Sequence, residues 1–325
     1  MSTLPRGLRQ HVKTISALLP EALRSQLYRQ YRRLRRSWQF YVSESALSLQ
    51  MPRGHYYSPL PEPAIAARHA EAAFRRDPAA GLPGINTHIT EQHELLLKMA
   101  SLYHDFDWNE YPRPGRRFHL RQGWYEYADS ICLYSMLRLF RPQRIIEVGS
   151  GFSSALMLDV NDHFLGHQTH FTFIEPHPDR LDQLLTPEDH ASVRIIPKPV
   201  QTVPLEEFSS LRSGDFLFID SSHISKTASD VNYLFFEVLP RLSVGVFVHV
   251  HDIFWPFEYP AQWMEMGCAL NESYLLRAFL SFNESFDIVF WTPFVARLWP
   301  EIIQKCMPAY MVNTGAALWF RRVRT

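Results

Sequence analysis

Residues 144–154, RIIEVGSGFSS, decide the fold that this sequence predicts. After Arg144, residues 145–148 form an apolar run interrupted only by Glu147, which is typical of a strand buried on both faces of a parallel sheet. Gly149 and Gly151 follow, and glycine can adopt a positive φ and let a ligand approach the backbone. A helix that begins near Ser153 would direct its first amide groups at the same space and favour an anionic group there. The stretch therefore predicts a strand–turn–helix unit that binds a ligand.

Short apolar runs alternate with helical stretches beyond this unit. Strands are expected at 170–175, 193–197, 215–220 and 244–250, and helices at about 153–164, 177–186, 204–212 and 225–241. This spacing suits right-handed β–α–β crossovers, so the sequence predicts an α/β, doubly wound, Rossmann-like sheet. Two further strands, 286–291 and 316–322, close the chain and are separated by a poorly helical stretch that contains prolines.

Three parts of different character follow one another along the chain. Residues 1–40 read as a basic amphipathic helical arm, 41–123 as a cap of helices and loops, and 124–325 as the α/β domain. The arm holds nine of the 33 basic residues but only one of the 33 acidic ones, so the rest is net acidic. The balance excludes a globally basic protein that coats nucleic acid. The arm itself suits either a solvated helix or a transient contact with a membrane surface or another protein.

Cysteine content and hydropathy indicate the compartment. Cys132, Cys268 and Cys306 are too few and too scattered for a disulfide framework or a thiolate zinc site, which favours a reducing environment. No apolar run approaches the ~18 residues of a membrane span. We therefore expect a cytoplasmic protein, with peripheral membrane contact through residues 1–40 as an option.

The acid that ends the second predicted strand indicates the class of cofactor. Glu175 follows Gly151 by 24 residues, where a ribose-binding carboxylate is expected in such folds. A dinucleotide site would have a third glycine where this chain has Ser154, and no P-loop lysine follows the glycines. Glu147 would be unfavourable beside a pyrophosphate but favourable beside the cationic amine of S-adenosylmethionine. The pattern thus predicts an adenosine-type cofactor, with S-adenosylmethionine favoured.

Polar residues gather where two neighbouring strands end. The fourth strand runs into Asp220-Ser-Ser-His223, and the fifth runs into His249-Val-His251-Asp252. Burying such groups without partners costs about 1–3 kcal/mol each, so they require partners or a function. His249 lies deeper in the strand, and we interpret it as a hydrogen-bonded core residue.

Two chemistries remain open at this edge. Asp220 and Asp252 could hold Mg²⁺ together with substrate oxygens, and Glu258 is a candidate for a third ligand. Alternatively, His223 or His251 could act without metal as a general base that removes a hydroxyl proton.

Two aromatic segments have both a structural and a functional interpretation, and a third feature has only a structural one. The aromatic segments 103–120 and 254–260 suit either walls of a substrate site or simple covers of the sheet. Asn271 and Glu272 precede a helical stretch, and helix capping explains that pair.

The quoted residues resemble a known family. EVGSGFSS and Ile174-Glu-Pro176 resemble the cofactor region of class I S-adenosylmethionine-dependent methyltransferases, over roughly residues 125–325. HYYSPLPE, YADSICLYSMLRLFRPQRIIEVGSGFSS, FIDSSH and VHDI together resemble a bacterial small-molecule group akin to the macrocin-type sugar O-methyltransferases. The resemblance implies a sheet of order 3-2-1-4-5-7-6 whose last strand is antiparallel. It also implies a cofactor at the carboxyl ends of the first, second and fourth strands.

Residue by residue, the resemblance implies a cofactor site and a catalytic wall. Cofactor contacts are implied for Glu147, Gly149, Ser150, Gly151, Ser153, Glu175 and Asp220. Among these, Glu175 would bind the ribose, while Glu147 and the glycines would contact the methionine part. Catalysis is assigned to His223, His251 and Asp252, and a metal-dependent form would place the ion on Asp220 and Asp252.

The expected function is methyl transfer from S-adenosylmethionine to an oxygen of a small molecule or glycosyl group. An NAD(P)-dependent oxidoreductase is one alternative. A non-catalytic adaptor that docks through the basic arm is another. A nucleic-acid acceptor is disfavoured because the body is net acidic and contains no Asn-Pro-Pro-Tyr sequence.

Overall fold

The computed structural model describes residues 51–325, so the arm predicted at 1–40 lies outside the described residues. The chain divides into two compact units, with the boundary between Ile65 and Ala66. Helix α3 (Pro63–Phe74) spans that boundary. Everything that follows concerns residues 66–325.

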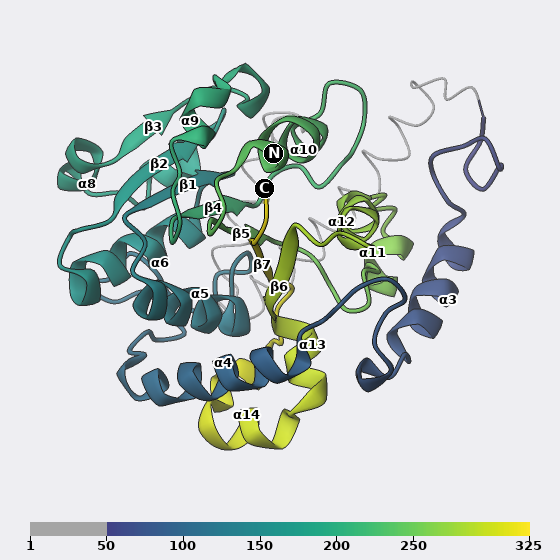
Figure 1. The fold of residues 1–325 in the computed structure, drawn as a ribbon, viewed down its shortest axis with the longest axis horizontal. Coiled ribbons are helices and arrows are strands. Elements are labelled where there is room, and N and C mark those ends of the chain that lie inside the picture. The colour runs from purple at the N-terminus through teal and green to yellow at the C-terminus, as the bar shows by residue number, and fades with distance from the viewer. Residues whose placement is uncertain (1–50) are drawn as a thin grey trace, which may run out of the picture. The chain divides into compact units, whose positions relative to one another are not determined.

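The core of this unit is one seven-stranded sheet in the order β3-β2-β1-β4-β5-β7-β6 (Figure 1). The strands are β1 (Arg144–Val148), β2 (His170–Ile174), β3 (Arg194–Ile196), β4 (Phe216–Ile219), β5 (Phe247–Val250), β6 (Phe286–Trp291) and β7 (Leu318–Arg322). The first five strands pair in parallel, and β7 runs antiparallel to both β5 and β6. The predicted fold class and strand order are confirmed.

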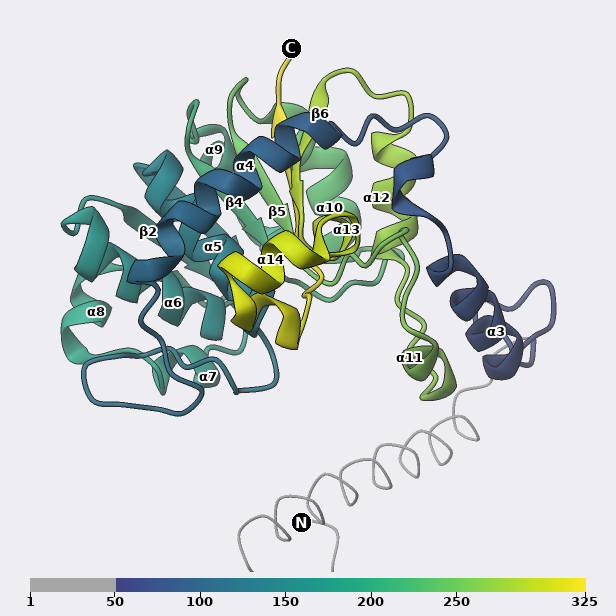
Figure 2. The same ribbon diagram turned by 90° about the horizontal axis from the view of Figure 1, so that it is seen from below.

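Helices cover both faces of the sheet. In Figures 1 and 2, α5 and α6 lie on one face and α10 lies on the other. The helices are α4 (Ile89–Leu102), α5 (Tyr127–Phe140), α6 (Phe152–Val160), α7 (Asp179–Asp182), α8 (Pro187–Ser192), α9 (Leu205–Ser209), α10 (Asp230–Tyr233), α11 (Ala261–Glu265), α12 (Glu272–Leu280), α13 (Thr292–Leu298) and α14 (Pro300–Cys306). Because both faces are covered, the parallel strands are buried throughout, which is why they read as continuous apolar runs.

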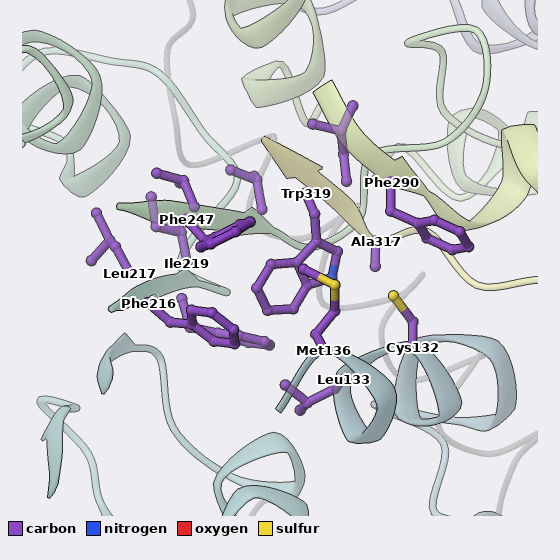
Figure 3. Close-up of a cluster of buried hydrophobic side chains, with 14 of the residues drawn as sticks. Cys132, Leu133, Met136, Phe216, Leu217, Ile219, Phe247, Phe290, Ala317 and Trp319 are labelled. Carbon is purple, nitrogen blue, oxygen red and sulfur yellow. The ribbon is translucent and has the colours of Figure 1, made fainter. Parts of the chain in front are cut away.

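Helix α5 packs directly against the middle of the sheet (Figure 3). Its Cys132, Leu133 and Met136 are fully buried and face side chains of β4, β5 and β7, among them Phe216 and Trp319. The order of strands in the sheet brings these three strands together, although β7 follows β5 by about 70 residues in the chain. This packing fixes the amino end of α5 against the carboxyl edge of the sheet.

The helical stretch expected at about 225–241 is present over 230–241 as α10, a π-helical turn (Leu234–Val238) and a 3₁₀ turn (Leu239–Arg241). One local expectation was wrong. The stretch between β6 and β7, expected to be poorly helical, forms α13 and α14. Pro293 and Pro300 each lie in the first turn of their helix, where the missing N–H has no helical acceptor to lose.

Within the described residues, no helix combines the length and the apolarity needed to cross a membrane.

Candidate active site

The glycine turn, residues 149–151, is pressed against the end of β4. Gly149 has φ +84°, and a Cβ added there would lie 1.8 Å from the carbonyl oxygen of Asp220. Only glycine allows this approach. Gly151 has φ 174°, which is extended backbone and does not use the positive φ that glycine permits. The backbone of the turn therefore packs directly against the backbone at the end of β4.

Glu147 lies beneath this turn and is fully buried. Its carboxylate accepts hydrogen bonds from the Ser153 hydroxyl at 2.5 Å and from the Ser154 hydroxyl, while Ser154 Oγ accepts from the Gly151 N–H at 2.9 Å. Burial raises the pKa of Glu147 to about 8, although the serine hydroxyls oppose the rise. In the structure, Glu147 fastens the start of α6 to β1, and its contact with the methionine part of a cofactor stays a prediction.

We expect Glu147→Gln to reduce the loss of stability that accompanies a rise in pH from 5 to 9. Because the pKa rises from 4.5 unfolded to about 8 folded, the proton on Glu147 stabilises the protein fully below pH 4.5. That contribution is lost as the pH rises through 8. Thermal unfolding at pH 5 and pH 9 should show a smaller drop in Tm for the variant than for the wild type. An equal drop in both proteins would contradict the buried, protonated state.

Glu175 bridges the glycine turn and the end of β2. Its carboxylate accepts from the Ser150 N–H at 3.2 Å and from the His177 N–H at 2.8 Å, and the side chain is half-buried. Each carboxylate oxygen keeps a lone pair for a further donor. The Ser150 hydroxyl is buried and has no hydrogen-bond partner among the described residues. Polar groups of the turn are thus left available beside Glu175.

Six ionisable side chains form an acid–imidazole cluster at the carboxyl edge of the sheet. Its members are Asp129, Asp220, His223, His251, Asp252 and Glu272. Carboxylates and imidazoles alternate through the cluster, which runs from Glu272 at one end to Asp129 at the other.

His251 occupies the half of the cluster that lies near α5. Its Nδ1 lies 3.3 Å from Asp220 and 3.8 Å from Asp252, and its Nε2 lies 3.3 Å from Asp129. Asp129 in turn accepts hydrogen bonds from the backbone N–H groups of residues 316 and 317 and from the Thr292 hydroxyl. The ring of His251 is therefore held from both nitrogens by carboxylates that are themselves fixed.

His223 occupies the other half. Its Nδ1 lies 2.8 Å from Glu272, and its Nε2 lies 3.4 Å from Asp220 and 3.5 Å from Asp252. His223 and Asp252 both have positive φ, +60° and +58°, a conformation that side chains other than glycine seldom adopt. His223 and Asp252 lie just after the ends of β4 and β5. Their unusual backbone conformation directs the two side chains toward each other.

The carboxylates hold both imidazoles in the charged form. Burial lowers the pKa of His251, but the charges of Asp220 and Asp252 and the hydrogen bonds to Asp129 and Asp220 together outweigh it and raise that pKa well above its usual value. The same balance, with hydrogen bonds that His223 donates to Asp220 and Glu272, raises the pKa of His223. Burial would raise the pKa of Asp220, yet the two imidazoles hold it well below its usual range. Burial raises the pKa of Asp252. The protonation states of these neighbouring groups are therefore linked.

The donor set does not fit a magnesium ion. Mg²⁺ requires several oxygen ligands in octahedral array, whereas Asp220 and Asp252 each face two imidazole rings. Across residues 51–325, no group of three or more His, Cys, Asp or Glu side chains is arranged to hold a metal ion. Glu258, the candidate third ligand, instead accepts hydrogen bonds from the Tyr274 hydroxyl and the Tyr259 N–H.

A family model covers the same part of the molecule. The model described as a methyltransferase domain matches residues 146–253, from the middle of β1 to the residue after Asp252. This span holds the glycine turn, Glu175 and four members of the cluster, and the sheet has the strand order that the family resemblance implied.

This chain contains a methyltransferase domain, and its sheet has the strand order that the class I resemblance implied.

Several known proteins resemble this methyltransferase. An uncharacterized protein of Archaeoglobus fulgidus is 32% identical over 166 residues, which are 50% of this chain and 74% of that protein. The Podospora anserina methyltransferase PaMTH1, solved with S-adenosylhomocysteine, is 14% identical with a TM-score of 0.40, over 82% of this chain and 99% of that one. The O-methyltransferase TomG of Streptomyces achromogenes is 14% identical with a TM-score of 0.38, over 71% and 90% of the two chains.

Two residues of the methyltransferase cluster were missed by sequence reasoning. Asp129 lies in the first turn of α5, and Glu272 begins α12. Capping was the wrong explanation for the pair at 271–272, because Asn271 makes no side-chain cap and Glu272 is fully buried on His223. No local sequence signal marks either residue, because each is an acid near a helix start that becomes buried only through tertiary packing.

His249 was assigned correctly to the core of the methyltransferase but wrongly given hydrogen bonds. Both ring nitrogens are buried without a partner among the described residues, and the ring stacks on Phe218 with centroids 3.8 Å apart. Burial lowers its pKa well below the usual value, so the ring is neutral. This histidine behaves as a flat aromatic residue.

Ion pairs and hydrogen bonds hold the aromatic segment 103–120 against the α/β domain. Arg117 reaches Asp159 at 3.0 Å, Asp162 at 2.7 Å and Asp189 at 2.6 Å. The buried Asp159 also accepts from the Trp108 indole at 2.9 Å. In the segment 254–260, Trp255, Phe257 and Tyr259 are buried. These contacts favour the interpretation of both segments as covers of the sheet over their interpretation as walls of a substrate site.

Proposed function

We propose that this chain transfers a methyl group from S-adenosylmethionine to a hydroxyl oxygen of a small molecule or glycosyl acceptor. The observation that carries the proposal is the packing of Gly149 on the carbonyl of Asp220. It places the turn expected to hold the cofactor directly against the acid–imidazole cluster. O-methyl transfer needs those two elements side by side, because the acceptor must lose a proton as it takes the methyl group.

The residues present fit the cofactor. Glu175 offers its free carboxylate lone pairs to the ribose hydroxyls, and the unpartnered Ser150 hydroxyl and the start of α6 lie at the same turn. The cluster holds four carboxylates against two imidazoles, so even with both rings charged it attracts a cation. Bound S-adenosylmethionine supplies an electrophilic methyl group with a neutral leaving group.

The chain's own contribution is to remove the hydroxyl proton. In its neutral form, His251 can accept that proton at a ring nitrogen, and Asp129 and Asp220 then stabilise the resulting imidazolium. His223 and Asp252 complete the path by which the proton leaves the cluster. Because the carboxylates raise the pKa of His251, its neutral form increases only at higher pH. The rate should therefore rise with pH above the usual histidine value of about 6.5.

The first test is calorimetric titration with S-adenosylhomocysteine, with NAD as a control and with EDTA present throughout. Binding of S-adenosylhomocysteine without NAD binding is the expected result. Methyl transfer from labelled S-adenosylmethionine to a panel of sugars and phenols, again in EDTA, then tests the reaction. Absence of S-adenosylhomocysteine binding, or transfer only to amines, would overturn the proposal.

Glu175→Ala should weaken S-adenosylhomocysteine binding at least about tenfold. The variant loses charge-assisted hydrogen bonds to the ribose, each worth about 1.5–3 kcal/mol. Glu188→Ala removes an exposed acid in the first turn of α8 and serves as the matched control. Equal affinity of wild type and Glu175→Ala would remove the ribose assignment.

A further inference from the structure

A second polar pocket lies at the opposite edge of the sheet, where the parallel strands begin. It has a volume of about 370 Å³ and is lined by the end of α5, the entrance of β1 and the entrance of β4. Three arginines contribute to its wall: Arg141, Arg144 and Arg212. The acid–imidazole cluster lies at the other end of the same strands, so this pocket is separate from the site described above.

None of the three arginines has a carboxylate partner among residues 51–325. Arg141 donates to the Phe164 carbonyl at 3.2 Å, Arg144 to the Ser210 carbonyl at 3.5 Å and Arg212 to the Ser209 carbonyl at 2.6 Å. These bonds engage one nitrogen of each guanidinium and neutralise no charge. Three like charges around a pocket of this size lie within about one Debye length, ~8–10 Å, and leave a positive potential there.

The one acid in the wall, Asp215, is buried and bound to the backbone. Its two oxygens accept from the N–H groups of Arg144 and Arg212, each at 2.9 Å. The carboxylate thereby joins the entrances of β1 and β4 and brings both arginines to the same pocket. Its hydrogen-bonding capacity toward the pocket is reduced, since each oxygen already holds a main-chain donor.

We propose that this pocket binds a phosphate-type oxyanion, carried by a soluble small molecule or by a lipid headgroup. Guanidinium groups bind phosphate oxygens through paired N–H donors, which is the chemistry that the free nitrogens of Arg141, Arg144 and Arg212 offer. Ser213, an exposed residue of the same wall, adds a hydroxyl donor. Residues 41–325 are net acidic, so the positive pocket is a local feature and not part of a general basic surface.

The test uses the full-length protein at low ionic strength and the double variant Arg144→Ala/Arg212→Ala. Calorimetry with inorganic phosphate and pyrophosphate measures the soluble source of the anion. Sedimentation with phosphatidylglycerol vesicles, against phosphatidylcholine vesicles, measures the lipid source. We expect the wild type to bind in one of these arms and the double variant to bind at least about tenfold more weakly. Added salt should weaken the wild-type binding.

Two controls separate the pocket from general charge and from unfolding. Arg194→Ala removes an arginine at the start of β3, which β2 separates from β1. Glu207 already pairs with Arg194 at 2.7 Å, so this variant should bind like the wild type. The double variant keeps both backbone N–H bonds to Asp215, so its Tm and its S-adenosylhomocysteine affinity should match the wild type. If its Tm falls, Arg144→Lys/Arg212→Lys replaces it and should still weaken binding by loss of the paired donors. Absence of binding in every arm, or equal weakening in Arg194→Ala, would overturn the proposal.

Discussion

Gly149→Ala is expected to abolish S-adenosylhomocysteine binding and to destabilise the protein by more than about 2 kcal/mol. A positive φ costs a non-glycine residue about 1–2 kcal/mol. The added Cβ would also meet the Asp220 carbonyl oxygen at 1.8 Å, so the turn and the end of β4 must move apart. Denaturant unfolding measures the stability change, and calorimetry measures the binding.

Gly166→Ala is the matched control for this change. Gly166 also has a positive φ, +67°, but a Cβ there would meet no heavy atom within 4 Å. The control should therefore lose only about 1 kcal/mol and keep its cofactor affinity. Similar losses in the two variants would show that the close approach to Asp220 contributes nothing beyond backbone strain.

His251→Gln is expected to lower kcat by about 10²–10⁴-fold while leaving cofactor affinity within a few-fold. Removal of a positioned general base has effects of this size. Glutamine keeps a polar group between Asp129 and Asp220 but cannot accept and release a proton. The pH dependence of kcat/KM separates chemistry from misfolding, because the rise above the usual histidine pKa should vanish in the variant.

His249→Phe provides the comparison two residues earlier on the same strand. The ring of His249 already stacks on Phe218, and neither nitrogen has a partner among the described residues. Phenylalanine keeps the stack and removes two buried polar atoms, so kcat should stay within about twofold and stability should not fall. A loss of kcat as large as that of His251→Gln would contradict the assignment of the general base to His251 and not to His249.

The sheet was predictable from the sequence because each parallel strand is buried on both faces. Runs such as those at 144–148 and 215–220 are apolar for this reason, and the order of helices between them permits few topologies. The short helices were harder. In 225–241 a helical pattern covers three kinds of turn, and between β6 and β7 the prolines that indicate a break lie in first turns.

Only those members of the acid–imidazole cluster that lie at the end of a strand were predictable from the sequence. His223, His251 and Asp252 follow apolar runs, so the parallel sheet alone brings them to one edge. Asp129 and Glu272 lie in helices and meet their histidines across 122 and 49 residues of chain. Locally, each reads as an ordinary acid near a helix start. Their contacts depend on how α5 and α12 dock, which no local pattern specifies.

The way Asp215 is held has a consequence for how this molecule can change over evolutionary time. Asp215 bonds to the peptide N–H of residues 144 and 212, and every amino acid except proline supplies that group. Side chains at these two positions can therefore be exchanged by mutation while the strand entrances keep their spacing. A lineage could therefore change the ligand preference of this pocket without first losing the fold.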